Sequence, residues 1–342
     1  MKRVLLYTLE YPPDQGGVAS YLYALHHALP AVTVIRATLG RYSPRWLGLV
    51  FDLIQRVRRD RIQCVAVSHV LPVGYAALVT RVIQRIPYVV FVHGLDLLRA
   101  RRDPWKKMWC GIVLRHARTV IANSRFTEKV AESYGVPREK LVVLTPCLEA
   151  LPVLASEEGR TGHTLLSVGR LVKRKNHATV IAVFPELIKR FPGLTYTIVG
   201  NGPERHELEE QIAKLKVRAH ITIKDHVSDA ERAALYEACD VFVLPVLSSG
   251  DDVEGFGIVF LEAASFAKPV VAGRGGGAEE AVEDMKTGIL IDPMRQEELV
   301  AAISTLLENP TYSRELGARA RARVEREFLC TSRAQALLKI YS

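Results

Sequence analysis

Residues 240–281 read DVFVLPVLSSGDDVEGFGIVFLEAASFAKPVVAGRGGGAEEA, and this stretch decides the fold. The run 241–244 is short, apolar and rich in β-branched residues, which is typical of a buried parallel strand. Residues 258–267 have a helical pattern, Pro269 ends that helix, and Val270 begins another apolar run. We therefore predict strand, polar loop, helix, strand, glycine-rich loop and helix in that order.

The loop before the predicted helix suits a phosphate and a sugar. Gly255 and Gly257 lead into the helix, whose first N–H groups and dipole favour an anion. Glu254 and Glu262 bracket the helix start with seven residues between them, and carboxylates accept hydrogen bonds from hydroxyl groups. Together these features favour a nucleotide sugar. The alternative is a solvated acidic loop and one glutamate on a helix surface.

The remainder of the chain alternates strand and helix patterns, which indicates doubly wound parallel sheets in an α/β protein. The polar segment 151–162 is typical of a linker between two such sheets. Predicted strands span 3–8, 32–37, 62–68, 88–93, 119–123 and 141–144 in the first half, and 164–168, 195–199, 221–224, 241–244, 270–272 and 289–291 in the second.

Loops at the carboxyl ends of these strands are the expected ligand sites. Gly16 and Gly17 lie between the first strand and its helix, where backbone can approach a ligand closely. His93 ends the fourth strand; it is either a structural histidine or a ligand contact. Asp96 either faces an acceptor or caps the next helix.

The turn SVGRLVKRKNH follows the first strand of the second half. Arg170 and Lys175 can reach a ligand from this turn and neutralise a departing diphosphate. Lys173 and Arg174 are expected to be solvated.

The strings EGFGIVFLEA, GRLVKRK and HG resemble motifs of the retaining glycosyltransferases of family 4, which have the GT-B fold. The resemblance implies two Rossmann-like β/α/β domains facing a cleft, with a C-terminal helix crossing back to the first domain. The expected division is an acceptor-binding domain over 1–155, a nucleotide-sugar-binding domain over 156–327, and a crossover helix over 328–342. The segment LVVLTPCLE departs from the family pattern, because it keeps Pro146 but lacks the usual glycine and aspartate.

The resemblance also implies residue roles. Glu254 and His93 would orient the donor sugar, Glu262 would bind the ribose, and Arg170 and Lys175 would hold the diphosphate. The catalytic candidates are His93, Glu254, Arg170 and Lys175, and the donor-binding candidates are Gly16, Gly17, Gly169, Arg170, Lys175, Gly200, Val227, Glu254, Phe256, Gly257, Ile258, Val259 and Glu262.

The function expected from the resemblance is transfer of a sugar, with retention, from a nucleoside diphosphate sugar to a lipid-linked or glycan acceptor in cell-envelope polysaccharide or glycolipid synthesis. Similarity to phosphatidylinositol mannoside-type mannosyltransferases slightly favours GDP-mannose over UDP-sugars. No cofactor or metal is expected, because two cations replace the metal and Asp251-Asp252 is not a D-x-D motif. The alternatives are a GT-B-type nucleotide-sugar epimerase or hydrolase, and a basic nucleic-acid-binding protein.

Charge is distributed unevenly along the 342 residues, whose net charge is +9. Residues 1–155 hold 22 Lys and Arg against 10 Asp and Glu, whereas residues 156–342 hold 24 against 27. Lys106 and Lys107 lie between Trp105 and Trp109, a composition suited to an anionic membrane surface. The two tryptophans are alternatively core residues on one helix face. No nucleic-acid partner is expected, since no recognised module occurs and the second half is not basic.

Compartment is predicted from what the sequence lacks. It contains no apolar run of about 20 residues, the length needed to span a bilayer. Its five cysteines are scattered without a C-x-x-C pair, and we expect them to be reduced. These features predict a cytoplasmic protein, with peripheral contact to the inner face of the cell membrane as a further expectation.

Overall fold

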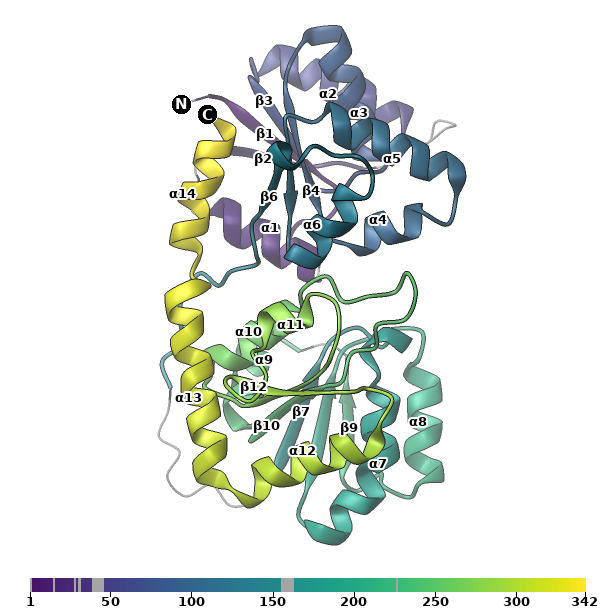
Figure 1. Cartoon of the computed structure of the whole chain (residues 1–342), viewed down its shortest axis with the longest axis vertical. Coiled ribbons are helices and arrows are strands. Elements are labelled where there is room, and N and C mark those ends of the chain that lie inside the picture. The colour runs from purple at the N-terminus through teal and green to yellow at the C-terminus, as the bar shows by residue number, and fades with distance from the viewer. Residues whose placement is uncertain are drawn as a thin grey trace. The chain divides into compact units, whose positions relative to one another are not determined.

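The computed structural model describes residues 2–14, 16–27, 29, 32–38, 46–154, 163–225 and 227–342. The chain forms two compact units (Figure 1). Unit 1 comprises Met1–Glu149 together with Leu329–Ser342, and unit 2 comprises Ala150–Phe328. Most of the predicted linker, residues 155–162, lies outside the described residues.

Unit 1 is built on a six-stranded parallel sheet with the strand order β2-β1-β3-β4-β5-β6. Strands β1 and β4 are buried at every position, because helices cover both faces of a doubly wound sheet. Its elements are β1 (Val4–Thr8), α1 (Gly17–His27), β2 (Val32–Arg36), α2 (Leu47–Arg59), β3 (Cys64–Val67), α3 (Val73–Gln84), β4 (Tyr88–Val92), α4 (Leu95–Ala100), α5 (Pro104–His116), β5 (Thr119–Ala122), α6 (Arg125–Glu132), η1 (Arg138–Lys140), β6 (Leu141–Val143) and α14 (Cys330–Tyr341).

Unit 2 is built on a second six-stranded parallel sheet with the order β12-β11-β10-β7-β8-β9. Its elements are β7 (Thr164–Val168), η2 (Lys173–Lys175), α7 (His177–Arg190), β8 (Thr195–Val199), α8 (Arg205–Lys214), β9 (Ile221–Lys224), α9 (Asp229–Ala238), β10 (Val241–Leu244), α10 (Ile258–Ser265), β11 (Val270–Gly273), α11 (Ala278–Ala281), β12 (Gly288–Ile291), α12 (Gln296–Glu308) and α13 (Pro310–Glu327).

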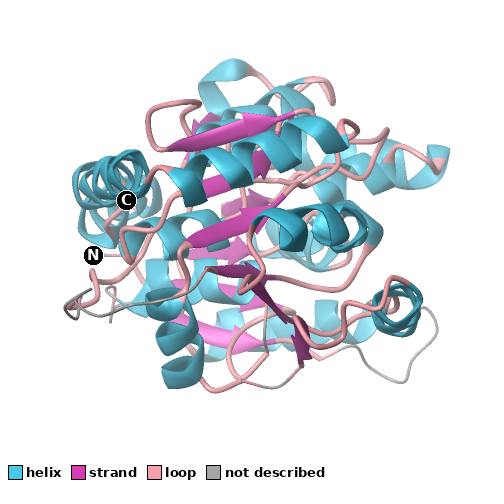
Figure 2. Cartoon of the chain, turned by 90° about the horizontal axis from the view of Figure 1, so that it is seen from below, coloured by secondary structure: helices cyan, strands magenta, loops and turns pink. Residues whose placement is uncertain are grey.

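The α/β class with parallel sheets is confirmed, and Figure 2 shows helices packed on both sides of the strands. All twelve predicted strands are present, with ends within two residues of those expected. The sheet order places β10 and β7 side by side in the middle of the second sheet. The loops that follow these two strands, which contain Glu254 and Lys175, therefore leave the same edge of the sheet.

The C-terminal helix α14 belongs to the core of unit 1. Leu337 and Tyr341 are buried against residues of α1, including Leu22 and Leu25. The Tyr341 hydroxyl lies 2.8 Å from Nε2 of His26, whose Nδ1 donates to the carbonyl of Leu22. Helix α14 is thus held by apolar packing and by a buried hydrogen bond.

The expectation that all five cysteines are reduced is wrong. Cys147 and Cys330 form a disulfide across a sequence separation of 183 residues, with their Cα atoms 5.1 Å apart. The two cysteines follow β6 and begin α14, so the fold brings together positions that no local spacing relates. Cys64, Cys110 and Cys239 are free and buried.

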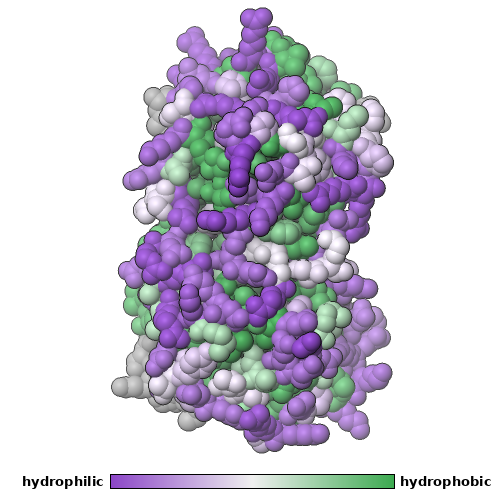
Figure 3. All heavy atoms as spheres, in the orientation of Figure 1, coloured by the Kyte–Doolittle hydropathy of each residue, from purple (hydrophilic) through white to green (hydrophobic). Residues whose placement is uncertain are grey.

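Figure 3 shows hydrophilic residues over much of the visible face, with apolar patches between them. Among the residues that the structure describes, none of the helices has the length and apolar character required to cross a bilayer.

The disulfide predicts how many cysteines a thiol reagent can label. Under denaturing conditions without reductant, a maleimide reagent should label three cysteines, since Cys147 and Cys330 are bonded to each other. After reduction it should label five, as read by intact mass spectrometry. A Cys147→Ser/Cys330→Ser variant is the control, with three labels in both conditions. Five labels on the unreduced wild-type protein would contradict the bond.

Candidate active site

The turn between β7 and α7 is fixed by hydrogen bonds to the loop after β10. Asn176 adopts a left-handed conformation, φ 56°, which reverses the chain at the start of α7. Its Nδ2 donates to the carbonyl of Pro245 at 3.1 Å, and the N–H of Leu247 donates to the carbonyl of Arg174 at 2.7 Å. These bonds hold the η2 turn and the β10–α10 loop together.

Glu254 is the centre of the ionic cluster that these two segments form. Nζ of Lys175 lies 2.8 Å from Oε2 of Glu254, and Nη1 of Arg174 contacts the same oxygen. Nε of Arg174 also lies 3.1 Å from Oδ1 of Asp252. The side chains of Glu254, Arg174 and Lys175 are only 12, 13 and 10% exposed, so the cluster is largely shielded from solvent.

The two cations keep Glu254 ionised. Burial alone would raise the pKa of its carboxyl group, but the charges of Lys175 and Arg174, with their hydrogen bonds, outweigh burial and lower it. The carboxylate is therefore an acceptor at neutral pH. A buried charge is tolerated only when it is paired in this way.

The expectation that the Arg174 side chain is solvated is wrong. Its guanidinium group is buried between two carboxylates rather than extended into water. Lys173 and Arg170, by contrast, are exposed. Nothing in the sequence separates Arg174 from Lys173, because the partners of Arg174 lie about 80 residues away.

The start of α10 lies next to the Glu254 carboxylate. Gly257 precedes the helix with φ 87°, and a Cβ atom there would lie 2.6 Å from the ring of Phe260 and 3.6 Å from Cγ of Glu254. Both the backbone conformation and the space thus require glycine. The N–H groups of Ile258 and Val259, in the first helical turn, have no intrahelical acceptors and can bind an anion.

Glu262 and Phe256 have protein partners of their own. The hydroxyl of Tyr236, on α9, donates to Oε2 of Glu262 at 2.7 Å, which fixes the orientation of a half-buried carboxylate. Phe256 is buried, and its ring centroid lies 5.9 Å from that of Phe328. Phe256 can therefore meet a ligand only through its backbone.

The predicted glycines at the sheet edge have a packing role. A side chain on Gly200 would collide with the carbonyl oxygen of Gly169, so the ends of β7 and β8 can approach only with glycine there. A Cβ on Gly169 would lie 3.4 Å from Cε of Lys175, so the lysine stem folds over this residue. Val227 is half-buried between β9 and α9. His226, considered for stacking on a base, lies outside the described residues.

In unit 1, His93 is a neutral, oriented imidazole. Its Nε2 donates to the carbonyl of Ser68 at 2.8 Å, which leaves Nδ1 as an acceptor. Burial and the nearby charge of His69 lower the pKa of His93 to about 4. Oδ1 of Asp96 accepts from the backbone N–H of His93 at 3.1 Å, so Asp96 fixes the turn between β4 and α4.

Two polar residues near His93 were not predicted from the sequence. The rings of His69 and His93 have centroids 5.4 Å apart, and Nε2 of His69 lies 3.6 Å from Oε1 of Glu10. Glu10 follows β1 and His69 follows β3, and this position at the end of a strand is the only signal in the sequence that could have identified them.

The two predicted glycines of unit 1 lie at the start of α1. Gly16 has open space where a Cβ would be, and Gly17 is exposed.

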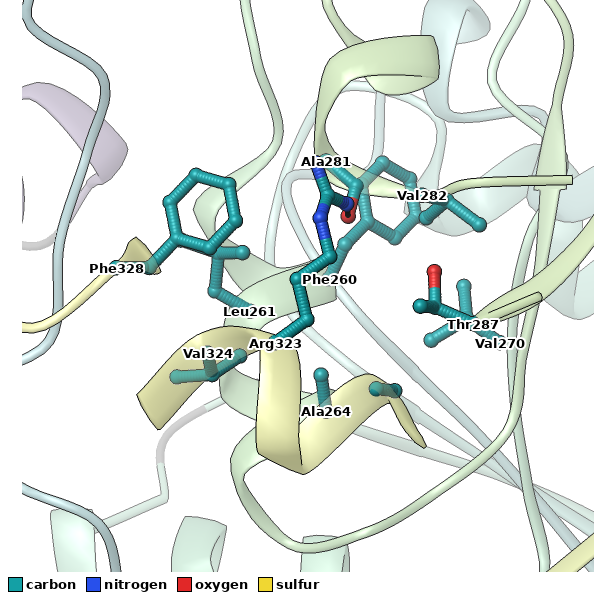
Figure 4. A pocket seen from close by; sticks show the side chains of 11 residues that line it. Phe260, Leu261, Ala264, Val270, Ala281, Val282, Thr287, Arg323, Val324 and Phe328 are labelled. Carbon is teal, nitrogen blue, oxygen red and sulfur yellow. Dashed lines mark hydrogen bonds between the residues drawn. The ribbon is translucent and has the colours of Figure 1, made fainter. Parts of the chain in front are cut away.

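The recess drawn in Figure 4 is part of the packing of unit 2. Its lining is apolar except for Thr287 and Arg323. Figure 4 shows the Arg323 side chain passing the ring of Phe260 toward Ala281, whose carbonyl accepts from Nη1 at 3.0 Å. Arg323 also donates to the carbonyl of Glu280 and to the carboxylate of Glu327. The bonds to the carbonyls of Glu280 and Ala281 tie α13 to α11, and the recess does not include the Glu254 cluster.

The structure thus brings together Gly169, Lys175, Glu254 and Gly257 in unit 2, and places Gly16, Gly17 and His93 in unit 1. Among the described residues, no cluster of three or more His, Cys, Asp or Glu side chains is arranged to hold a metal ion.

Family models match both halves of the chain. Residues 3–149 match the model described as Glycosyltransferase Family 4, and residues 155–323 match Glycosyl transferases group 1. A GDP-mannose-dependent alpha-(1-6)-phosphatidylinositol monomannoside mannosyltransferase of Mycobacterium tuberculosis is 28% identical, over 94% of this chain and 93% of that protein. Its counterpart in Mycolicibacterium smegmatis is also 28% identical, over 92% and 91%.

Solved structures share the fold over nearly the whole chain. Anabaena HepE in complex with UDP has a TM-score of 0.84 at 21% identity and covers 99% of each chain. A sucrose-phosphate synthase from Thermosynechococcus elongatus has a TM-score of 0.83 at 20% identity, over 99% of this chain and 98% of that one. With two matching family models and this shared architecture, the chain belongs to the family 4 glycosyltransferases, which have the GT-B fold.

Proposed function

We propose that this glycosyltransferase transfers a sugar, with retention of configuration, from a nucleoside diphosphate sugar to a lipid-linked or glycan acceptor in cell-envelope polysaccharide or glycolipid synthesis. GDP-mannose is the favoured donor. The observation that carries the proposal is the ionised Glu254 carboxylate beside Lys175 and the free N-terminus of α10. A carboxylate for hydroxyl groups thus adjoins donors for phosphate oxygens.

The donor diphosphate is bound by groups from two segments of unit 2. Lys175 comes from the η2 turn, and Arg170 is exposed in the same connection, two residues after the end of β7. The backbone N–H groups at Gly257, Ile258 and Val259 add the positive end of the α10 dipole. As the bond between sugar and phosphate breaks, these fixed donors stabilise the charge on the leaving diphosphate.

The sugar and ribose hydroxyls are bound by acceptors. Oε2 of Glu254 is occupied by both cations, and the other carboxylate oxygen accepts from a sugar hydroxyl. Neutral His93 offers Nδ1 as a further acceptor for the sugar. Glu262, oriented by Tyr236, accepts from the ribose.

Retention follows from attack on the same face as the departing diphosphate. The acceptor hydroxyl forms the new bond to the anomeric carbon as the bond to the phosphate oxygen breaks. The leaving phosphate oxygen takes the proton of that hydroxyl, so charge and protons balance without a protein nucleophile. The proposed role of unit 1 is to bind the acceptor, and that of unit 2 is to bind the donor.

The choice of donor rests on the mannosyltransferase relatives, which match more than nine-tenths of the chain. The solved structure with UDP shares only the fold at 21% identity, and so gives no preference for the base. Metal independence is also proposed, because Lys175 and Arg170 supply the charge that a divalent cation would supply to the diphosphate.

Donor choice predicts a ligand-induced rise in melting temperature. GDP-mannose and GDP should raise it more than UDP-glucose and UDP, because a ligand that binds only the folded state stabilises it by mass action. Differential scanning fluorimetry with EDTA present measures this difference. Preference for a UDP-sugar would overturn the donor assignment.

Transfer assays complete the test of metal independence. Activity that EDTA abolishes and magnesium restores would contradict it. Donor breakdown without any acceptor would instead indicate a hydrolase.

The two motif glutamates should have separable effects. Glu254→Gln removes the charge that faces the sugar and should lower kcat by about 100-fold or more, the effect of one preorganised electrostatic group. Glu262→Gln should instead weaken GDP affinity, by roughly tenfold for one charged hydrogen bond. Calorimetry and initial rates distinguish the two. Glu325→Gln, at an exposed position of α13, is the control; equal loss of GDP affinity in both motif variants would contradict the assignment.

We also propose peripheral contact between unit 1 and an anionic membrane. Trp105 and Met108 on α5 are 63 and 45% exposed, and Lys106 and Lys107 between them are exposed as well. The Trp105 ring packs on Trp109, 5.8 Å away, so the apolar surface is held in place. Of the two alternatives for this segment, a solvent-facing Trp105 supports surface binding.

Liposome sedimentation tests this contact. Binding to phosphatidylglycerol vesicles should exceed binding to phosphatidylcholine vesicles and should fall with salt. Lys106→Gln/Lys107→Gln should weaken it about 30-fold, since each basic residue contributes about 1 kcal/mol. Met294→Ser, at an exposed apolar position in unit 2, is the control. Equal binding to both vesicle types at low salt would contradict the proposal.

A further inference from the structure

We infer that Arg174 is a positioning residue, which holds Glu254 toward the donor sugar while Lys175 moves to the donor diphosphate. The inference rests on the proposed function, and it gives distinct tasks to two neighbouring cations of the η2 turn. Arg174 acts on the reaction through Glu254 and does not itself touch the donor.

The first support is the geometry of the Arg174 fork. Nε lies 3.1 Å from Oδ1 of Asp252, while Nη1 contacts Oε2 of Glu254. A planar guanidinium group can bridge two carboxylates in this way, whereas an ammonium group is a single point of charge. Arg174 is therefore bound at two places within the β10–α10 loop.

The second support is that the backbone of Arg174 is fixed too. Its carbonyl accepts from the N–H of Leu247 at 2.7 Å, and the adjacent Asn176 bonds to the carbonyl of Pro245 at 3.1 Å. The side chain is 13% exposed and lies between its two carboxylates. It has little freedom to turn toward a ligand, and its charge is already matched by Asp252 and Glu254.

Lys175 differs in each respect. Its Nζ contacts Glu254 at 2.8 Å, which is the single ion pair found for it among the described residues. Its flexible stem lies over Gly169, at the edge of the sheet. When an anionic diphosphate enters, Lys175 can exchange one anion for another, as a point charge on a flexible chain allows.

This exchange explains why Glu254 needs a second cation. If Lys175 were its only partner, movement of Lys175 to the phosphate would leave a buried carboxylate unpaired, which is strongly unfavourable. Arg174 keeps the carboxylate charged and oriented through that step. Among the described residues, the charged groups that face Glu254 are thus Arg174 and Lys175 from the η2 turn, with Asp252 from its own loop bound to Arg174.

The test compares Arg174→Gln with Lys175→Gln. GDP is the probe for binding affinity, and kcat is measured with the donor that supports transfer by the wild-type enzyme. Lys173→Gln is the matched control, since it removes the same charge from the same turn at an exposed position. We expect Arg174→Gln to lower kcat by about 30- to 100-fold while GDP affinity stays within about threefold. Lys175→Gln should weaken GDP binding by about tenfold or more.

A pH profile distinguishes positioning from a general loss of structure. Loss of Arg174 removes one of the two charges that lower the pKa of Glu254, so the carboxyl group protonates at higher pH. The acid limb of kcat should therefore move upward in Arg174→Gln and stay in place in Lys173→Gln. Arg174→Lys should restore part of kcat, because one ammonium group can pair with Glu254 but cannot bridge to Asp252.

Two results would overturn the inference. One is an Arg174→Gln variant with wild-type kcat, and the other is a loss of GDP affinity as large as that of Lys175→Gln, which would make Arg174 a phosphate ligand. Should Arg174→Gln fail to fold, Arg174→Lys and Asp252→Asn answer the same question, since both should lower kcat without weakening GDP binding. Wild-type transfer with the donor panel tests the proposed function separately, so the two failures are distinguishable.

Discussion

A buried carboxylate that cannot be left unpaired is the constraint on which the rest of unit 2 depends. Glu254 as a whole residue is 9% exposed, and among the described residues Lys175 and Arg174 are the cations that offset the cost of taking its charge out of water. The η2 turn after β7 and the β10–α10 loop must therefore be positioned accurately relative to each other. The same pairing that offsets burial of the carboxylate also keeps it ionised, and therefore a hydrogen-bond acceptor.

The parallel sheet is what allows these segments to meet. Strands β7 and β10 are neighbours, so the turn after one and the loop after the other leave the sheet side by side. Close backbone approaches also join the β10–α10 loop to the loop after β11: a Cβ on Gly277 would collide with the carbonyl of Gly255, and the Gly277 N–H donates to the carbonyl of Glu254 at 2.8 Å. Glycines at this edge are therefore required by loop packing, whatever ligand binds there.

Local patterns made most of the fold predictable, and distant pairings did not. Short apolar runs located the central strands because these are buried on both faces, and the spacing of Glu254 and Glu262 located the start of α10. The partners of Arg174 lie 78 and 80 residues away, and Cys147 bonds to a cysteine 183 residues later. No periodicity or spacing encodes such contacts. His69 and Glu10 were not predicted for the same reason, because in the sequence each is an ordinary polar residue and only the folded sheet brings their loops together.

The position of α14 makes unit 1 discontinuous in the chain. Leu148 and Leu329 pair as a β-bridge next to the disulfide, so unit 2 is an insertion whose two ends are fastened at one point of its host. A protein truncated before residue 329 would keep an intact second sheet yet expose the apolar face of α1. Burial of Leu337 alone contributes roughly 1.5–3 kcal/mol. The last 14 residues are therefore as much a part of the first sheet's domain as its opening strand.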